Sequence, residues 1–108
     1  MCACATFAAI TGAVAEGNDH ELWRLDDGEW AGRERILACI RSYEGDYGTE
    51  TGNGHHGAYQ FVQSTWDGAA ARAGYPQWVG RRAGDAPAHV QDDVAWQLYT
   101  ERGFGPWP

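Results

Sequence analysis

The chain has 108 residues, which is enough for a single domain built around one hydrophobic core. Its 15 acidic residues outnumber its 8 basic residues, so the formal net charge is −7. This charge argues against binding to DNA or RNA, because that binding depends on Lys and Arg side chains that neutralise phosphates. It argues equally against an anionic membrane surface, and no apolar run reaches the roughly 18–20 residues that a membrane span requires.

The first 15 residues form an apolar segment without any acidic or basic side chain. The segment ends in Ala13-Val14-Ala15, which is typical of a signal-peptide cleavage site, although the usual basic region before the apolar stretch is missing. We expect residues 1–15 to be either part of a signal peptide, which favours export, or an apolar N-terminal helix. Residues 16–32 are polar and acidic, and we expect Gly28 and Gly32 to interrupt any helix there. This stretch is therefore predicted to be a linker or arm before a domain at 33–108.

The first predicted helix of that domain spans residues 33–43 and ends at Glu44-Gly45, where glycine is a common residue after the last turn. One face is predicted to be apolar and carries Ile36, Leu37, Ile40 and Tyr43. The other face is predicted to be polar and carries Arg33, Glu34 and Arg41. Cys39 lies within this helix, and we expect it to be a small buried apolar side chain.

The segment after this helix, residues 45–57, is rich in glycine and other turn-forming residues. Asn53-Gly54 is a strong hairpin-turn dipeptide, so we expect a short, irregular β-hairpin around it. Residues 58–61 would form either the return strand or the turn into the next helix. Ser64 is predicted to cap that second helix, which stops at Gly74.

The last predicted helix opens at Asp85 and Pro87, continues to about Arg102 and ends at Gly103. The tail at 104–108 cannot continue a helix and is expected to fold back on the core. The first and last helices should meet along a buried seam of Ile36, Leu37, Ile40, Val94 and Leu98. The expected fold class is α+β, mainly helical, with one short β-hairpin.

Glu44 is the residue whose position points most directly to chemistry. Cleavage of a glycosidic bond needs a carboxylic acid that stays protonated near neutral pH. Burial and the negative end of a helix dipole both raise the pKa of a carboxyl group, and Glu44 would experience both at the end of an apolar helix. Taken by itself, however, a glutamate near a helix end is more often a solvated surface residue.

The surrounding motifs resemble a known family. They are Ile40-Arg41-Ser42-Tyr43-Glu44-Gly45, then Thr51-Gly52-Asn53-Gly54, then Gly57-Ala58-Tyr59-Gln60-Phe61, and then Gln63-Ser64-Thr65-Trp66. In this order they resemble the transglycosylase-like domain of the resuscitation-promoting factors, which are secreted peptidoglycan-cleaving proteins with a reduced lysozyme-like fold. The resemblance covers residues 33–108, about two thirds of the chain.

Carried over by position, the resemblance makes Glu44 the general acid. It also implies that five further residues line or support the sugar groove: Thr51, Asn53, Tyr59, Gln60 and Trp66. Two features depart from the family pattern. The spacing from Glu44 to Thr51 differs slightly, and the family's cysteine after Pro-Trp has no counterpart before the chain ends at Pro108. The family disulfide to the position of Cys39 is therefore not expected here.

The mechanism that the resemblance implies uses a single carboxyl group. Glu44 would protonate the glycosidic oxygen of the MurNAc–GlcNAc β-1,4 bond, and the N-acetyl group of muramic acid would assist. Glu44 would then take the C6 hydroxyl proton, which releases a 1,6-anhydro product. Glycosidases with two carboxylates are the alternative, and Asp46 is the candidate for a second one.

No metal or cofactor is expected. His55 and His56 are adjacent in a loop and lack the spacing of helical zinc ligands, so we expect them to edge the groove. The expected partner is the glycan of peptidoglycan, with another cell-wall hydrolase as a candidate protein partner, and the chain is expected to be a secreted monomer at the cell wall. Two alternatives are a cell-wall module that binds glycan without cleaving it and a lysin segment of a larger assembly such as a virion.

Overall fold

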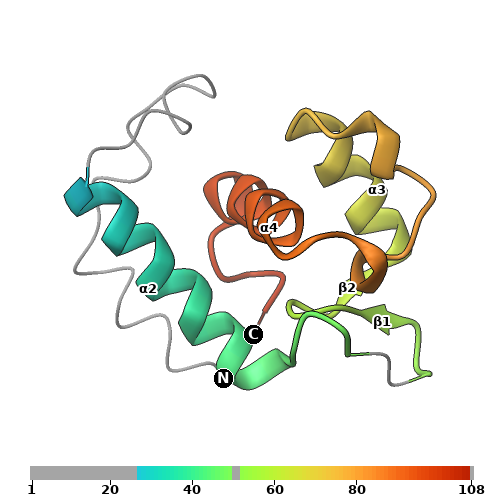
Figure 1. Cartoon of the computed structure of the whole chain (residues 1–108), viewed down its shortest axis with the longest axis horizontal. Coiled ribbons are helices and arrows are strands. Elements are labelled where there is room, and N and C mark those ends of the chain that lie inside the picture. The colour runs from blue at the N-terminus through green and yellow to red at the C-terminus, as the bar shows by residue number, and fades with distance from the viewer. Residues whose placement is uncertain (1–26, 50–51, 108) are drawn as a thin grey trace.

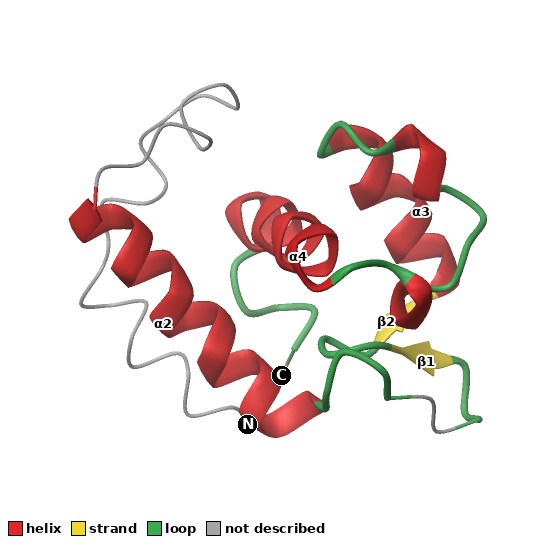
Figure 2. Cartoon of the chain, in the orientation of Figure 1, coloured by secondary structure: helices red, strands yellow, loops and turns green. Residues whose placement is uncertain are grey.

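The computed structural model describes residues 27–49 and 52–107. In chain order the elements are α2 (Asp27–Glu44), β1 (His55–His56), β2 (Phe61–Val62), α3 (Gln63–Arg72), the 3-10 helices η3 (Pro76–Trp78) and η4 (Ala83–Asp85), and α4 (Ala88–Arg102). Helix α4 lies between α2 and α3, and the hairpin lies beside α3 (Figure 1). Figure 2 shows that helices dominate over one small sheet, which confirms the predicted α+β class. Within the described ranges, no helix has the length and apolar character needed to cross a bilayer.

The core forms where α2 and α3 pack against α4. The five seam residues predicted from the sequence are each at most 1 % exposed: Ile36, Leu37, Ile40, Val94 and Leu98. Full burial of one such side chain contributes roughly 1.5–3 kcal/mol, so this seam is a main source of stability. The prediction that the first and last helices meet there is confirmed.

Helix α2 begins at Asp27, six residues earlier than predicted. Gly28 and Gly32 lie inside it, so the expectation that they interrupt a helix is wrong. A glycine costs only about 1 kcal/mol relative to alanine in a helix. The contacts of Arg33 offset that cost, because its guanidinium pairs with Asp93 of α4 at 2.6 Å and lies 4.3 Å from the centre of the Trp30 ring within α2.

The two faces of α2 also differ in part from the prediction. Arg33, expected on the polar face, is only 2 % exposed, whereas Tyr43, expected on the apolar face, is 59 % exposed. Arg33 is buried because its partner Asp93 lies on α4, 60 residues away in the chain. Tyr43 is exposed because the seam with α4 ends before the last turn of the helix.

The hairpin is present, but its turn lies elsewhere. His55 pairs with Val62 and His56 with Phe61 in an antiparallel ladder, so the connecting turn is residues 57–60 and not Asn53-Gly54. The Asn53 side chain instead accepts a hydrogen bond from the backbone N–H of His55 at 3.1 Å. Asparagine commonly forms such a local turn with the backbone two residues on, and here it leads the chain into β1.

Helix α3 begins at Gln63 directly after β2, and no side chain caps its N-terminus, so the predicted Ser64 cap is wrong. Gln63 is held by its side-chain amide, which donates to Asp67 in the next turn of α3 at 2.8 Å and to the carbonyl of Arg81 at 2.9 Å. Helix α4 ends as predicted at Gly103, whose φ of 61° suits glycine.

The C-terminal tail folds back on the core, as predicted. Trp107 is 3 % exposed, and its indole N–H donates to the carbonyl of Tyr59 at 3.0 Å. Its ring also makes edge-on contacts with the rings of Tyr59 and Phe61. The tail therefore fixes the turn of the hairpin from the side opposite α3.

The prediction that Cys39 is a small buried apolar side chain is wrong. It is half-buried and disulfide-bonded, and is not a free apolar side chain. The predictions for residues 1–26, which include the apolar segment and most of the acidic arm, also lie outside the described residues, as does Thr51.

Candidate active site

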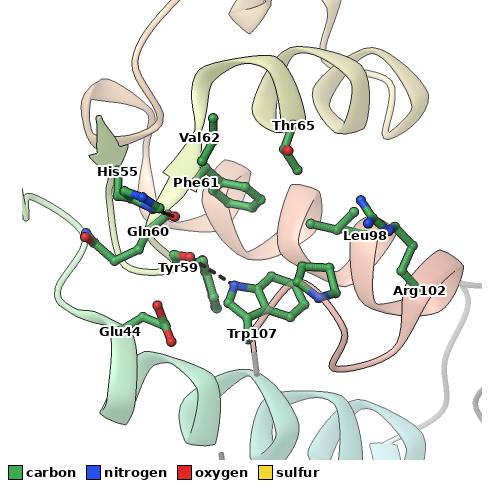
Figure 3. A pocket seen from close by; sticks show the side chains of 11 residues that line it. Glu44, His55, Tyr59, Gln60, Phe61, Val62, Thr65, Leu98, Arg102 and Trp107 are labelled. Carbon is green, nitrogen blue, oxygen red and sulfur yellow. Dashed lines mark hydrogen bonds between the residues drawn. The ribbon is translucent and has the colours of Figure 1, made fainter. Parts of the chain in front are cut away.

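A pocket of about 390 Å³ lies where the C-terminal ends of α2 and α4 approach the hairpin (Figure 3). Its volume falls in the range of pockets that hold small ligands, about 300–1,000 Å³. Its polar lining consists of Glu44, His55, Gln60, Thr65 and Arg102. Its remaining lining consists of Tyr59, Phe61, Val62, Leu98, Pro106 and Trp107.

Glu44 is the last residue of α2 and the only carboxylic acid among the described residues that line the pocket. It is half-buried, and this burial raises the pKa of its carboxyl group, while the nearby His55 lowers it by a smaller amount. The negative end of the α2 dipole favours the protonated form as well. Glu44 is thus placed to donate a proton to a ligand in the pocket.

His55 lines the pocket from β1, next to Glu44 and Gln60 (Figure 3). Its Nδ1 is 3.2 Å from the carbonyl oxygen of Gln60, which favours a proton on Nδ1 that this carbonyl accepts. Both histidines are predicted from the sequence to edge the groove. His55 does so, but its neighbour His56 is not part of the lining.

Gln60 lines the pocket from an unusual backbone conformation, with a φ of 52°. Its side-chain amide donates to the carbonyl of Gly57 at 2.9 Å, which closes the turn of the hairpin. One N–H of this amide is therefore engaged within the protein, and the amide oxygen can accept a hydrogen bond from a ligand.

Tyr59 contributes a wall of the pocket but no free hydroxyl. Its side chain is fully buried, and its hydroxyl donates to Asp92 at 2.6 Å and accepts from Arg41 at 2.8 Å. Burial, followed by the hydrogen bond to Asp92, raises the pKa of Tyr59. Tyr59 is therefore neutral, and its place in the site is to support the hairpin turn.

Asp92 on α4 is the centre of this polar network. It accepts hydrogen bonds from Tyr59 and also from Tyr47 at 2.8 Å, and its carboxylate lies 3.4 Å from the guanidinium of Arg41. Burial and then the contact with Asp92 raise the pKa of Tyr47 to about 12. Since Arg41 lies three residues before Glu44, the network fixes the last turn of α2 against the hairpin and α4. Sequence reasoning missed Asp92, whose only signal is its place beside the apolar stripe of α4.

Gln91, the neighbour of Asp92, holds the start of the hairpin turn. Its buried amide accepts a hydrogen bond from the N–H of Ala58 at 3.0 Å and donates to the carbonyls of Tyr47 and Ala86. A side chain at Gly57 would place its Cβ 2.5 Å from the amide oxygen of Gln91, and Gly57 has a φ of 77°. Both constraints require glycine at this position.

Three other residues predicted for the site, Trp66, Asn53 and Asp46, lie outside the pocket lining. Trp66 is fully buried, donates to the carbonyl of Trp78 at 2.9 Å and packs its ring edge-on against Phe61, so it supports the wall from behind. Asn53 and Asp46 are exposed, Asn53 before β1 and Asp46 in the turn after α2. No group of three or more metal-ligating side chains occurs in residues 27–49 and 52–107.

Thr65, Arg102 and Trp107 line the pocket without having been predicted for the site. Thr65 lies in one of the motifs that resemble the family, Arg102 marks the predicted end of the last helix and Trp107 lies in the predicted tail. Each enters the lining because α3, α4 and the tail converge on the hairpin. No local sequence signal marks that convergence.

Residues 34–108 match the family model described as a transglycosylase-like domain. The chain is 38 % identical over 61 residues to the probable transglycosylase SceD 2 of Staphylococcus saprophyticus, which is 56 % of this chain and 23 % of that protein. It is 44 % identical over 55 residues to the probable transglycosylase SceD of Staphylococcus epidermidis, and 42 % identical over 55 residues to that of Staphylococcus aureus strain Newman. These two matches cover 51 % of this chain and 23 % and 22 % of those proteins. The chain thus spans less than a quarter of these relatives, and no solved structure matches it significantly.

Proposed function

This chain belongs to the transglycosylase-like domain family, and we propose that it cleaves the MurNAc–GlcNAc β-1,4 bond of peptidoglycan with Glu44 as its single general acid and base. The observation that carries the proposal is the position of Glu44: a half-buried carboxyl group with a raised pKa, facing a pocket of suitable size. The names of the staphylococcal relatives, probable transglycosylases, support the same class of reaction.

The proposed reaction has two steps. First, the Glu44 carboxyl group gives its proton to the glycosidic oxygen, the bond from that oxygen to C1 of MurNAc breaks, and the N-acetyl carbonyl oxygen of MurNAc bonds to C1. Second, the Glu44 carboxylate takes the proton of the C6 hydroxyl, whose oxygen bonds to C1 and displaces the N-acetyl oxygen. The products are a 1,6-anhydro sugar and a new chain end, and Glu44 is protonated again. Attack by water in the second step would make the protein a muramidase.

Three features of the pocket support this scheme. Among the described residues, no second carboxylic acid lines it, and a two-carboxylate glycosidase would need one. Phe61 and Trp107, each only 3 % exposed, give the pocket an apolar base, and the amide oxygen of Gln60 can accept a sugar N–H or O–H. Removal of water by these apolar side chains would strengthen the proton transfer from Glu44.

The subfamily of this domain and its location are also part of the proposal. The motifs around Glu44 and the hairpin favour a domain like that of the resuscitation-promoting factors, acting outside the cell at the cell wall. A glycan-binding module without activity would not need a half-buried carboxyl group of raised pKa beside an apolar wall, so Glu44 favours the enzyme.

The test is mass spectrometry of the fragments that the purified protein releases from sacculi. We expect MurNAc ends in the 1,6-anhydro form. Reducing MurNAc ends would instead indicate hydrolysis, in which water and not the C6 hydroxyl attacks C1. If the protein binds sacculi but releases no fragment, the result would support a module that binds glycan without cleaving it.

A further inference from the structure

The end of the pocket opposite Glu44 carries a positive charge. Arg102, the last residue of α4, and Thr65, in the first turn of α3, line this end, and Glu44 lies at the other (Figure 3). Leu98 and Trp107 provide an apolar surface between them. A ligand that spans the pocket would therefore meet a proton donor at one end and a cation at the other.

No ion-pair partner neutralises the charge of Arg102 within the described ranges. Arg33 pairs with Asp93, and Arg41 pairs with Glu34 and Asp92. Arg102 makes no hydrogen bond or ion pair in residues 27–49 and 52–107 and interacts with its neighbour Glu101 only through the electrostatic field.

The carboxylate of Glu101 is bonded to residues other than Arg102. Its carboxylate takes two hydrogen bonds from Arg72, at 2.7 and 2.8 Å, and a third from Gln97. A basic residue in the last turn also complements the dipole of its own helix, but that interaction does not require the side chain to line a pocket. The planar guanidinium of Arg102 thus keeps donors that match the two oxygens of a carboxylate.

We propose that Arg102, assisted by the Thr65 hydroxyl, binds a carboxylate of the glycan and so favours strands that contain muramic acid over strands that lack it. This inference rests on the proposed function. The net charge of −7 would repel an anionic ligand, so a local cation is required to accept one. Two parts of peptidoglycan carry the matching group: the lactyl carboxylate of a muramic acid without peptide, and the carboxylates of the stem peptide.

The experiment measures the affinity of three ligands by isothermal titration calorimetry, in an E44Q background that prevents cleavage. The ligands are a chitooligosaccharide without carboxylates, glycan strands freed of peptide and strands with their stem peptides. We expect Arg102→Gln to weaken binding of carboxylate-bearing ligands by about two- to fivefold, the range that exposed ion pairs contribute. Binding of the chitooligosaccharide should not change. Loss confined to peptide-free strands identifies the lactyl group, and loss confined to strands with peptides identifies the stem.

Arg82→Gln is the matched control, because Arg82 is exposed, lies outside the pocket lining and changes the net charge equally. It should leave all three affinities unchanged. Thr65→Val should reduce the same preference as Arg102→Gln, and rising salt should weaken carboxylate binding to the parent but not to the R102Q variant. Equal affinities of the parent and the R102Q variant for carboxylate-bearing strands would overturn the inference. Failure to bind any of the three ligands would instead contradict the proposed function.

Discussion

At the Glu44 end of the pocket the polar side chains behind the carboxyl group are hydrogen-bonded to one another, whereas at the other end Arg102 makes no hydrogen bond within residues 27–49 and 52–107. Asp92 joins Tyr59, Tyr47 and Arg41 behind Glu44, while Arg102 is exposed on the last turn of α4. The difference fits two tasks. Proton transfer needs a geometry that is already fixed before the ligand arrives, and recognition of a flexible charged group tolerates a side chain that adapts. Substitutions at the Glu44 end should therefore have larger effects on activity than substitutions at the Arg102 end.

Glu44→Gln should reduce glycan cleavage by about 10²–10⁴-fold, the usual contribution of a general acid. The amide keeps the shape of the side chain but cannot donate the proton, so the circular dichroism and thermal midpoint should stay close to those of the parent. The measurement is the rate of product release from sacculi. Asp46→Asn is the control and should retain most activity, since Asp46 is exposed outside the pocket. An equal collapse in both variants would favour a two-carboxylate mechanism.

Asp92→Asn should lower activity by roughly 10²-fold if the network positions Glu44, because small displacements of catalytic groups have effects of that size. It should also lower the free energy of unfolding by about 3 kcal/mol, through weakened hydrogen bonds to a charged acceptor. The neighbouring Asp93→Asn is a matched control, since Asp93 bonds to Arg33 and Tyr75 away from the pocket.

Both variants should lose stability, but only Asp92→Asn should lose turnover per folded molecule. Turnover that is unchanged in Asp92→Asn would make the network a structural feature alone. The two readouts are urea denaturation and the rate of product release, measured at a temperature where both variants are folded.

Gln60→Ala should reduce turnover by roughly tenfold, which corresponds to about 1.4 kcal/mol. The expected cause is a sugar donor left without the amide oxygen of Gln60. The variant should also lose about 1 kcal/mol of stability, because the hydrogen bond to the carbonyl of Gly57 disappears. Gln60→Gly separates the side chain from the backbone, since glycine relieves the strain of the positive φ. Full activity in the glycine variant would remove the Gln60 side chain from the site.

His55→Gln should move the alkaline limb of the pH profile of kcat/KM to higher pH. Activity requires protonated Glu44 and falls as pH rises through its pKa. Burial raises that pKa and a charged His55 opposes the rise, so a neutral glutamine at position 55 should leave the pKa of Glu44 higher still. His56→Gln is the control, because His56 lies outside the pocket lining, and its profile should match that of the parent. A limb that moves to lower pH, or does not move, would contradict this electrostatic coupling.

Local patterns predicted the features that depend on near neighbours. The apolar spacing of Ile36, Leu37 and Ile40 identified the buried face of α2, because residues three and four apart share one face of a helix. Gly103 predicted the end of α4 for a similar local reason, its positive φ. The position of the hairpin turn was not predicted correctly. Asn53-Gly54 has the residues of a hairpin turn, but the turn lies at residues 57–60, where Gln91 accepts a hydrogen bond from the N–H of Ala58 and Trp107 donates one to the carbonyl of Tyr59.

By itself, the sequence determined that the chain is mainly helical, where the apolar seam lies and that a glutamate ends the first helix of the core. These features follow from periodicity and turn chemistry within a few residues. Only the tertiary structure decided that Arg33 is buried against Asp93, that Trp66 supports the wall while Trp107 lines the pocket, and that Arg102 shares the pocket with Glu44. Such contacts join distant parts of the chain, and they depend on how whole helices pack, which no local pattern encodes.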